Sequence, residues 1–196
     1  MTIVKTNSLK AQKERRAQKR RRSRIQGLFL ISLGTAFLIA LVAILARPDP
    51  SSQIGPARIG QPAPDLVLND LSGKQVRLSD FTGRPVLINA WATWCPPCRA
   101  EMPDLHEFFL EHRAAGFTLL AINAGESQST VSEFITQTGF TFPVLLDPNS
   151  NTLSRLGIFS YPTSILIGRD GIVKTIRPGM LTPEMLQAEI APLLAQ

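Results

Sequence analysis

The chain has 196 residues, enough for one ordinary domain plus an appendage, and its net charge of +6 is unevenly distributed. The first 24 residues hold ten Lys and Arg and one acid, whereas the rest holds eleven basic and fourteen acidic residues. A nucleic-acid-binding domain would carry its basic charge on the folded part, so we expect no nucleic-acid partner. Two cysteines are too few for a disulfide-stapled scaffold or for a structural zinc site with four ligands.

The N-terminal segment has the charge pattern of a membrane anchor. No residue between 25 and 46 is charged, and as a helix this span measures about 33 Å, enough to cross the hydrocarbon core. The basic cluster lies on one side only, and the positive-inside rule places that side in the cytoplasm. We therefore expect a basic cytoplasmic tail at 1–24, a single transmembrane anchor in contact with lipid at 25–46, and a catalytic domain outside the cytoplasm.

Two other interpretations of this segment, a cleaved signal peptide and an RNA-binding arm, fit it less well than an anchor. A cleaved signal peptide would have an apolar region of about 7–15 residues that ends in small residues. Here the apolar run is longer, and Leu45 stands where a small residue is needed. The basic run could instead be an RNA-binding arm, but its place directly before an apolar span is explained more simply by topology. With an anchor or with a signal peptide, the remaining chain lies where disulfides form and persist.

After a linker rich in Pro, Ser and Gly at 47–58, residues 59–196 predict one folded domain. Its apolar runs predict an α/β sandwich with a mixed central sheet. In chain order we expect a hairpin of strands at 66–68 and 76–78, a buried strand at 86–91, a helix from Pro96 to about Arg113, a strand at 117–123, a helix at 129–138, a strand at 142–146, a short helix at 152–156, strands at 163–167 and 172–176, and a last helix from Pro183.

The only two cysteines, Cys95 and Cys98, stand two residues apart where the predicted strand at 86–91 gives way to a helix. The nucleophile in thiol–disulfide exchange is the thiolate, and the unpaired N–H groups at a helix N-terminus stabilise it. We therefore predict that Cys95 is the attacking thiolate and that Cys98, one turn further in, is the resolving thiol. Pro96 and Pro97 suit the first turn of a helix, where a missing N–H costs least. This pattern is typical of a two-electron carrier that uses its own disulfide and no other cofactor.

Polar residues on neighbouring elements complete the predicted site. Glu101 follows Cys98 by three residues, so the two share a helix face, and a partly buried acid there could pass protons. The alternative is that Glu101 is an exposed surface acid. Asn89, inside the buried strand, is expected to be a hydrogen-bonded core residue. His106 and His112 point about 240° apart around the helix, so we expect both to be partly exposed surface residues and expect no metal site.

The motifs around the dithiol resemble those of the membrane-anchored thioredoxin-like proteins of bacteria, the TlpA/ResA/CcmG group of the AhpC/TSA-redoxin superfamily. They are Trp94-Cys95-Pro96-Pro97-Cys98, the preceding Trp91-Ala92, the following Arg99-Ala100-Glu101-Met102-Pro103, and the distant Tyr161-Pro162-Thr163. The resemblance covers residues 59–196. It implies a thioredoxin fold with an N-terminal hairpin and a central αβ insertion.

The same resemblance implies roles for individual residues. Pro162 would be a cis-proline facing the dithiol, although the residues alone make a cis bond the minority outcome. Glu101 would match the active-site glutamate of the group. Cytoplasmic thioredoxins carry a buried aspartate where Asn89 stands, and Glu101 is the candidate replacement for that acid. The residues expected to bind substrate are Trp94, Pro96, Pro97, Tyr161 and Pro162.

The function implied by the resemblance is that of an extracytoplasmic thiol–disulfide oxidoreductase of a bacterial cytoplasmic membrane, which reduces protein disulfides. Its clients would include apocytochrome c during cytochrome c maturation, and a membrane electron carrier of the CcdA/DsbD type would recharge it. One alternative is a peroxide reductase of the peroxiredoxin type, but the Pro and Thr/Ser of that motif fall on Ile88 and Ala92. Another is a copper chaperone or binding module, which uses Cys-x-x-x-Cys and a distal histidine. Here the spacing is shorter and no histidine follows His112.

Overall fold

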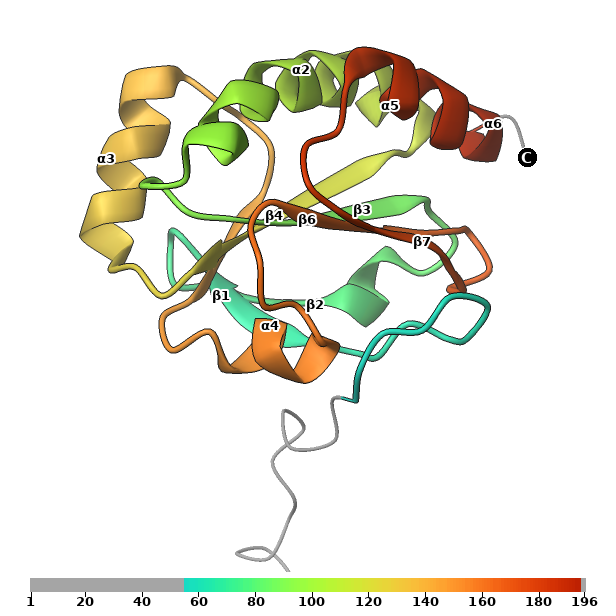
Figure 1. Ribbon diagram of the computed structural model, residues 1–196, viewed down its shortest axis with the longest axis horizontal. Helices are drawn as coiled ribbons and strands as arrows, with labels where there is room; N and C mark the ends of the chain where they lie inside the picture. Colours follow the sequence, from blue (N-terminus) through green and yellow to red (C-terminus); the bar gives the residue numbers. More distant parts are fainter. Residues whose placement is uncertain (1–54, 195–196) are drawn as a thin grey trace, which may run out of the picture. The chain divides into compact units, whose positions relative to one another are not determined.

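The computed structural model describes residues 55–194, which build a seven-stranded mixed sheet with helices on both faces (Figure 1). The sheet has the strand order β2-β1-β5-β4-β3-β6-β7. The elements are β1 (Val67–Asp70), β2 (Gln75–Arg77), the 3-10 turn η2 (Leu78–Phe81), β3 (Val86–Trp91), α2 (Pro96–His112), the 3-10 turn η3 (Arg113–Ala115), β4 (Thr118–Ala124), α3 (Gln128–Thr138), β5 (Val144–Asp147), α4 (Asn151–Leu156), β6 (Thr163–Ile167), β7 (Val173–Pro178), α5 (Pro183–Glu189) and α6 (Ala191–Leu194).

The centre of the sheet is formed by β3 and β4, which run parallel and are buried along their whole length. β5 continues the parallel part beside β4, and β6 pairs with the other edge of β3 in the antiparallel sense. Strands covered on both faces are expected to be continuous apolar runs, as these are. The mixed sheet expected from the sequence is therefore confirmed, and β4 is its central strand, with β3 beside it.

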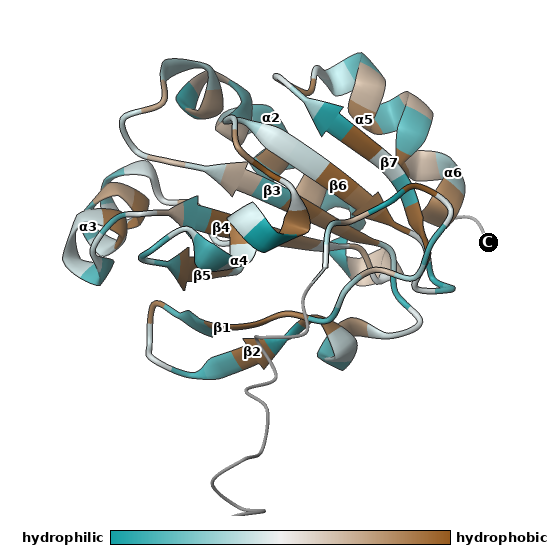
Figure 2. Ribbon diagram, turned by 60° about the horizontal axis from the view of Figure 1, so that its bottom comes forward, coloured by the Kyte–Doolittle hydropathy of each residue, from teal (hydrophilic) through white to brown (hydrophobic). Residues whose placement is uncertain are grey.

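Alternate residues of the central strands feed two separate hydrophobic cores, because successive side chains of a strand point to opposite faces. Leu87 and Leu119 pack with α2, α3 and α5 on one face, whereas Ile88 and Leu120 pack with α4 and the N-terminal hairpin on the other. In Figure 2 the central strands are largely hydrophobic, and the helices alternate between hydrophobic and hydrophilic segments. The helix α2 begins shortly after the C-terminal end of β3, which lies next to the C-terminal end of the parallel strand β4.

The expected N-terminal hairpin and αβ insertion are both present. β1 and β2 pair as an antiparallel hairpin, and β1 also pairs with β5. Both strands lie one or two residues from their predicted positions, and β2 ends at Arg77 because Leu78 begins the turn η2. The insertion consists of α3 and β5, and it extends the sheet to meet the hairpin.

The membrane prediction falls outside this structure. Within residues 55–194 no helix is both long and apolar enough to cross a bilayer. The expected tail at 1–24, the expected anchor at 25–46 and most of the expected linker at 47–58 lie outside the described residues, so these boundaries stay predictions.

Candidate active site

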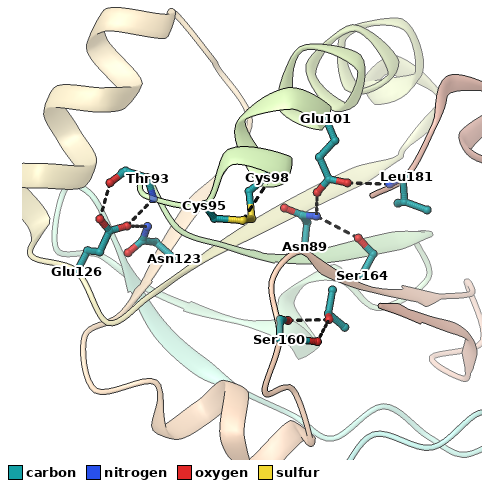
Figure 3. The surroundings of a disulfide bond; sticks show 11 residues. Asn89, Thr93, Cys95, Cys98, Glu101, Asn123, Glu126, Ser160, Ser164 and Leu181 are labelled. Carbon is teal, nitrogen blue, oxygen red and sulfur yellow. Dashed lines mark hydrogen bonds between the residues drawn. A yellow bond between two sulfur atoms is a disulfide. The ribbon is translucent and has the colours of Figure 1, made fainter. Parts of the chain in front are cut away.

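The two cysteines form a disulfide where β3 passes into α2 (Figure 3). β3 ends at Trp91, and a turn closed by the Cys95 N–H on the carbonyl of Ala92, at 3.2 Å, leads into the helix. Cys95 is the N-cap of α2, and its sulfur accepts a hydrogen bond from the N–H of Cys98 at 3.3 Å. The chain thus places a sulfur where Ser, Thr or Asp usually cap a helix, against the positive end of the helix dipole.

Access to the disulfide is asymmetric. Cys98 is completely buried, whereas Cys95 retains 3% of its surface and is flanked by the exposed residues Trp94, Pro96 and Pro97. In the oxidised form Cys95 is thus less exposed than a surface nucleophile would be. The two prolines occupy the first two positions of α2, as the sequence predicts. A thiol from another molecule therefore meets Cys95 before Cys98.

Glu101 is a buried acid, so the alternative of an exposed surface residue is wrong. One carboxylate oxygen accepts from the side-chain amide of Asn89 at 2.8 Å, and the other accepts from the N–H of Leu181 at 2.8 Å. Asn89 also donates to the hydroxyl of Ser164 at 3.1 Å. Burial raises the pKa of Glu101 above its ordinary value, and the hydrogen bonds from Leu181 and Asn89 offset part of that rise. A buried acid with a raised pKa, one turn from Cys98, has the properties of a proton donor and acceptor.

Asn89 is the hydrogen-bonded core residue that the sequence predicts, but only one side of its amide is satisfied. Its nitrogen donates twice, while its buried oxygen has no donor among the described residues. In Figure 3 this oxygen lies on the side of the amide that faces Cys98. The unmatched acceptor therefore lies on the side of Asn89 that faces the helix turn with the disulfide.

A second carboxylate lies on the opposite flank of the dithiol in Figure 3. Glu126 follows β4 and accepts three hydrogen bonds, from the N–H of Thr93 at 2.7 Å, the hydroxyl of Thr93 at 2.5 Å and the amide of Asn123 at 2.7 Å. Thr93 belongs to the turn that precedes Cys95. No local sequence pattern points to Glu126, because its bond to the turn before Cys95 spans 33 residues and depends on the parallel pairing of β3 with β4.

The loop before β6 approaches the dithiol from the other half of the chain. The Tyr161–Pro162 peptide bond is cis, which confirms that expectation. The rings of Trp94 and Tyr161 lie edge to face, with centroids 6.1 Å apart. The carbonyl of Pro162 accepts from the N–H of Gly179 at 2.9 Å, so the segment after β7 joins the same group. Tyr161 of this loop therefore lies beside Trp94, the residue that precedes Cys95.

The histidines and acids offer no metal centre in the part of the chain that is described. His106 bonds to Thr141 and lies against Phe140 and Phe142, and His112 is a partly exposed residue near the end of α2. No group of three or more His, Cys, Asp or Glu side chains within residues 55–194 could hold a metal ion.

Comparisons with known proteins agree with this geometry. The AhpC/TSA family matches residues 59–176. The chain belongs to the AhpC/TSA family. Over 132 residues it is 39% identical to the thiol-disulfide oxidoreductase ResA of Geobacillus thermodenitrificans, covering 67% of this chain and 76% of that relative.

Solved structures of this AhpC/TSA member's relatives show the same fold. A thiol:disulfide interchange protein, DsbE, of Chlorobium tepidum matches with a TM-score of 0.66 and 33% identity, over 70% of this chain and 99% of that one. StoA of Bacillus subtilis matches with a TM-score of 0.56 and 27% identity, over 65% of this chain and 96% of that one. The fold is thus the thioredoxin fold, and with its Cys95–Cys98 pair the chain is a thiol–disulfide oxidoreductase of the ResA/DsbE/StoA type.

Proposed function

We propose that this protein reduces disulfide bonds in other proteins, with Cys95 as the attacking sulfur and Cys98 as the resolving sulfur. The observation that carries the proposal is the position of the pair, with Cys95 as N-cap of α2 and Cys98 sealed behind it. An N-terminal helix position stabilises a thiolate, and a buried neighbour can attack only after the first sulfur has been captured.

The proposed reaction proceeds in two exchanges. The Cys95 thiolate attacks one sulfur of the client disulfide, and the other client sulfur leaves as a thiolate that takes a proton. Cys98 then loses its proton and attacks Cys95, which closes the disulfide of this protein and releases the second client sulfur as a thiolate. Two electrons thus pass from the Cys95–Cys98 pair to the client. We assign to Glu101 the acceptance of the Cys98 proton, because it is a buried acid on the same helix, one turn further on.

The proposed clients dock on an apolar rim around the dithiol, which we define as Trp94, Phe159 and Met180. Their exposed fractions are 64%, 79% and 43%. Trp94 precedes Cys95, Phe159 lies in the loop that leads to the cis bond, and Met180 follows Gly179, which bonds to Pro162. Exposed large apolar side chains gathered at one site favour contact with a protein chain over contact with a small polar thiol.

The proposed setting is the outer side of a bacterial cytoplasmic membrane, with residues 25–46 as the anchor in lipid. The basic residues before that span and the absence of charge within it support this topology. Apocytochrome c in cytochrome c maturation is the proposed client, and a membrane carrier of the CcdA/DsbD type is the proposed electron donor. Both are proposed from the resemblance of the motifs at residues 91–103 and 161–163 to the TlpA/ResA/CcmG group.

The equilibrium reduction potential of the Cys95–Cys98 pair, measured against a glutathione or dithiothreitol buffer, tests the direction of electron flow. A value near that of thioredoxin, about −270 mV, is the expected result, and a value near −120 mV would mark an oxidant and refute the proposal. A second assay follows the order of attack. With a client disulfide, Cys98→Ser should trap a mixed disulfide through Cys95, whereas Cys95→Ser should trap none. Equal trapping by both variants would contradict the assigned roles.

A further inference from the structure

The turn that connects β3 to Cys95 is bound by one side chain from elsewhere in the chain, that of Glu126. Its residue Thr93 presents a backbone N–H and a hydroxyl, and both donate to the carboxylate of Glu126, at 2.7 and 2.5 Å. The turn is only four residues long, since the N–H of Cys95 donates to the carbonyl of Ala92. A shift of Thr93 therefore moves the adjoining segment that carries Cys95.

Glu126 is itself held in place by the neighbouring strand and helix. Asn123, a fully buried residue of β4, donates to the same carboxylate oxygen that binds the Thr93 N–H. Gly125 makes the bend between them with φ +73°, a conformation that favours glycine, and its N–H donates to the carbonyl of Asp147 at 2.9 Å. Ser127, the next residue, is the N-cap of α3. A carboxylate anchored on both sides gives the turn a rigid point of attachment.

We infer that Glu126 is a positioning residue for the thiol–disulfide reaction, which fixes through Thr93 the placement of Cys95 at the N-terminus of α2. The inference rests on the proposed role of Cys95 as the attacking sulfur. Among the described residues, Glu126 accepts hydrogen bonds from Thr93 in the turn and from Asn123 in β4, and from neither cysteine. Glu126 therefore acts on Cys95 through the turn. Hydrogen bonds that neutral donors make to a carboxylate are stronger than those to a neutral acceptor, and a turn without them would not keep the sulfur aligned with the helix dipole.

Two substitutions separate the geometry of Glu126 from its charge. Glu126→Gln removes the charge and can keep all three bonds, because its oxygen can accept from Thr93 and Asn123 while its amide donates to the Thr93 hydroxyl. Glu126→Ala removes both charge and bonds. The difference between these two variants therefore isolates positioning. Glu133→Ala on α3 is the matched control, since Glu133 is exposed and bonds only to Gln137 of its own helix among the side-chain bonds of the described residues.

The experiment measures alkylation of Cys95 by iodoacetamide across pH in the full-length chain carrying Cys98→Ser, where Cys95 is the one remaining thiol. We expect Glu126→Gln and Glu133→Ala to react within about twofold of the parent chain at pH 7. We expect Glu126→Ala to react about tenfold more slowly, with its rate profile shifted to higher pH. This is the effect of a rise of about one unit in the pKa of the Cys95 thiol. Thermal unfolding of each variant in the same Cys98→Ser chain reports on folding separately.

Equal rates and equal pH profiles for Glu126→Ala and Glu126→Gln would overturn the inference, even if the alanine variant unfolds at a lower temperature, because Glu126 would then only stabilise the fold. Should Cys95 of the parent chain react no faster than a free cysteine at any pH, the proposed role of Cys95 would fail as well. The two failures are therefore distinguishable in one data set.

Discussion

The buried carboxyl of Glu101 makes the stability of this protein depend on pH in a direction that can be worked out. Its pKa is raised by burial above the ordinary value of 4.5. At low pH both the folded and the unfolded states hold the proton. Between 4.5 and the raised pKa only the unfolded chain ionises, so the free energy of unfolding falls by about 1.4 kcal/mol for each pH unit. Above the raised pKa the loss is complete and constant.

The substitution Glu101→Gln removes this dependence without emptying the site. The glutamine oxygen can accept from the N–H of Leu181, and its amide can donate to the oxygen of Asn89 after that side chain turns over. We therefore expect urea unfolding of the oxidised chain to give a glutamine variant that gains on the parent as pH rises, by up to about 1.4 kcal/mol per unit. A difference between the two proteins that stays flat from pH 4 to pH 9 would refute the raised pKa of Glu101.

Three further predictions test other contacts. Asn89→Ala removes a hydrogen bond that lowers the pKa of Glu101, so in the same urea series the Glu101-dependent loss of stability should begin near the same pH as in the parent but continue to a higher pH. Trp94→Ala should leave the free energy of unfolding within about 0.5 kcal/mol of the parent, because the side chain is mostly exposed. The variant should nevertheless reduce a protein disulfide more slowly than the parent, with its reduction of glutathione disulfide unchanged. Leu110→Ala, at an exposed apolar residue of α2, is the control, and equal slowing with both substrates would contradict a docking role. Asp147→Ala should cost about 1–2 kcal/mol in urea unfolding, because the buried Asp147 carboxylate accepts from the N–H of Leu153 in the first turn of α4; an unchanged midpoint would show that water replaces this bond.

Local patterns in the sequence were sufficient to predict most of the fold. The run from Val86 to Trp91 is largely apolar because both faces of β3 are covered. The two prolines between Cys95 and Cys98 indicate the start of α2, because proline is tolerated in the first turn of a helix. Boundaries were less predictable where a residue has a choice of partners. Leu78 is as apolar as a strand residue, but it begins a 3-10 turn, because the N–H of Arg77 donates to the carboxylate of Asp80 at 3.0 Å and caps that turn.

Only those residues of the site that lie close to the cysteines in the sequence could be predicted from spacing. Glu101 could be placed near the dithiol because it lies on the same helix, but its burial depends on Leu181, which is 80 residues away. Glu126 carries no local signal at all, since an acid after a buried strand is ordinary until β4 is known to lie parallel to β3. Met180 likewise becomes part of the apolar rim only through the bond from Gly179 to Pro162. Tertiary pairing supplies what periodicity and spacing lack.

Most of the buried side-chain polar atoms without a partner among the described residues lie on β3 and β4. Of the five such side-chain atoms in the described part of the chain, three belong to the strands that flank Cys95, namely those of Asn89, Trp91 and Asn123. An unsatisfied buried donor or acceptor costs about 1–3 kcal/mol, so a chain selected only for stability would have little reason to keep three of them together. Conflicts between local rules and the native structure are expected where function requires them. Two of the three side chains, Asn89 and Asn123, donate hydrogen bonds to Glu101 and Glu126, the acids on either side of the dithiol, which supports the assignment of the site.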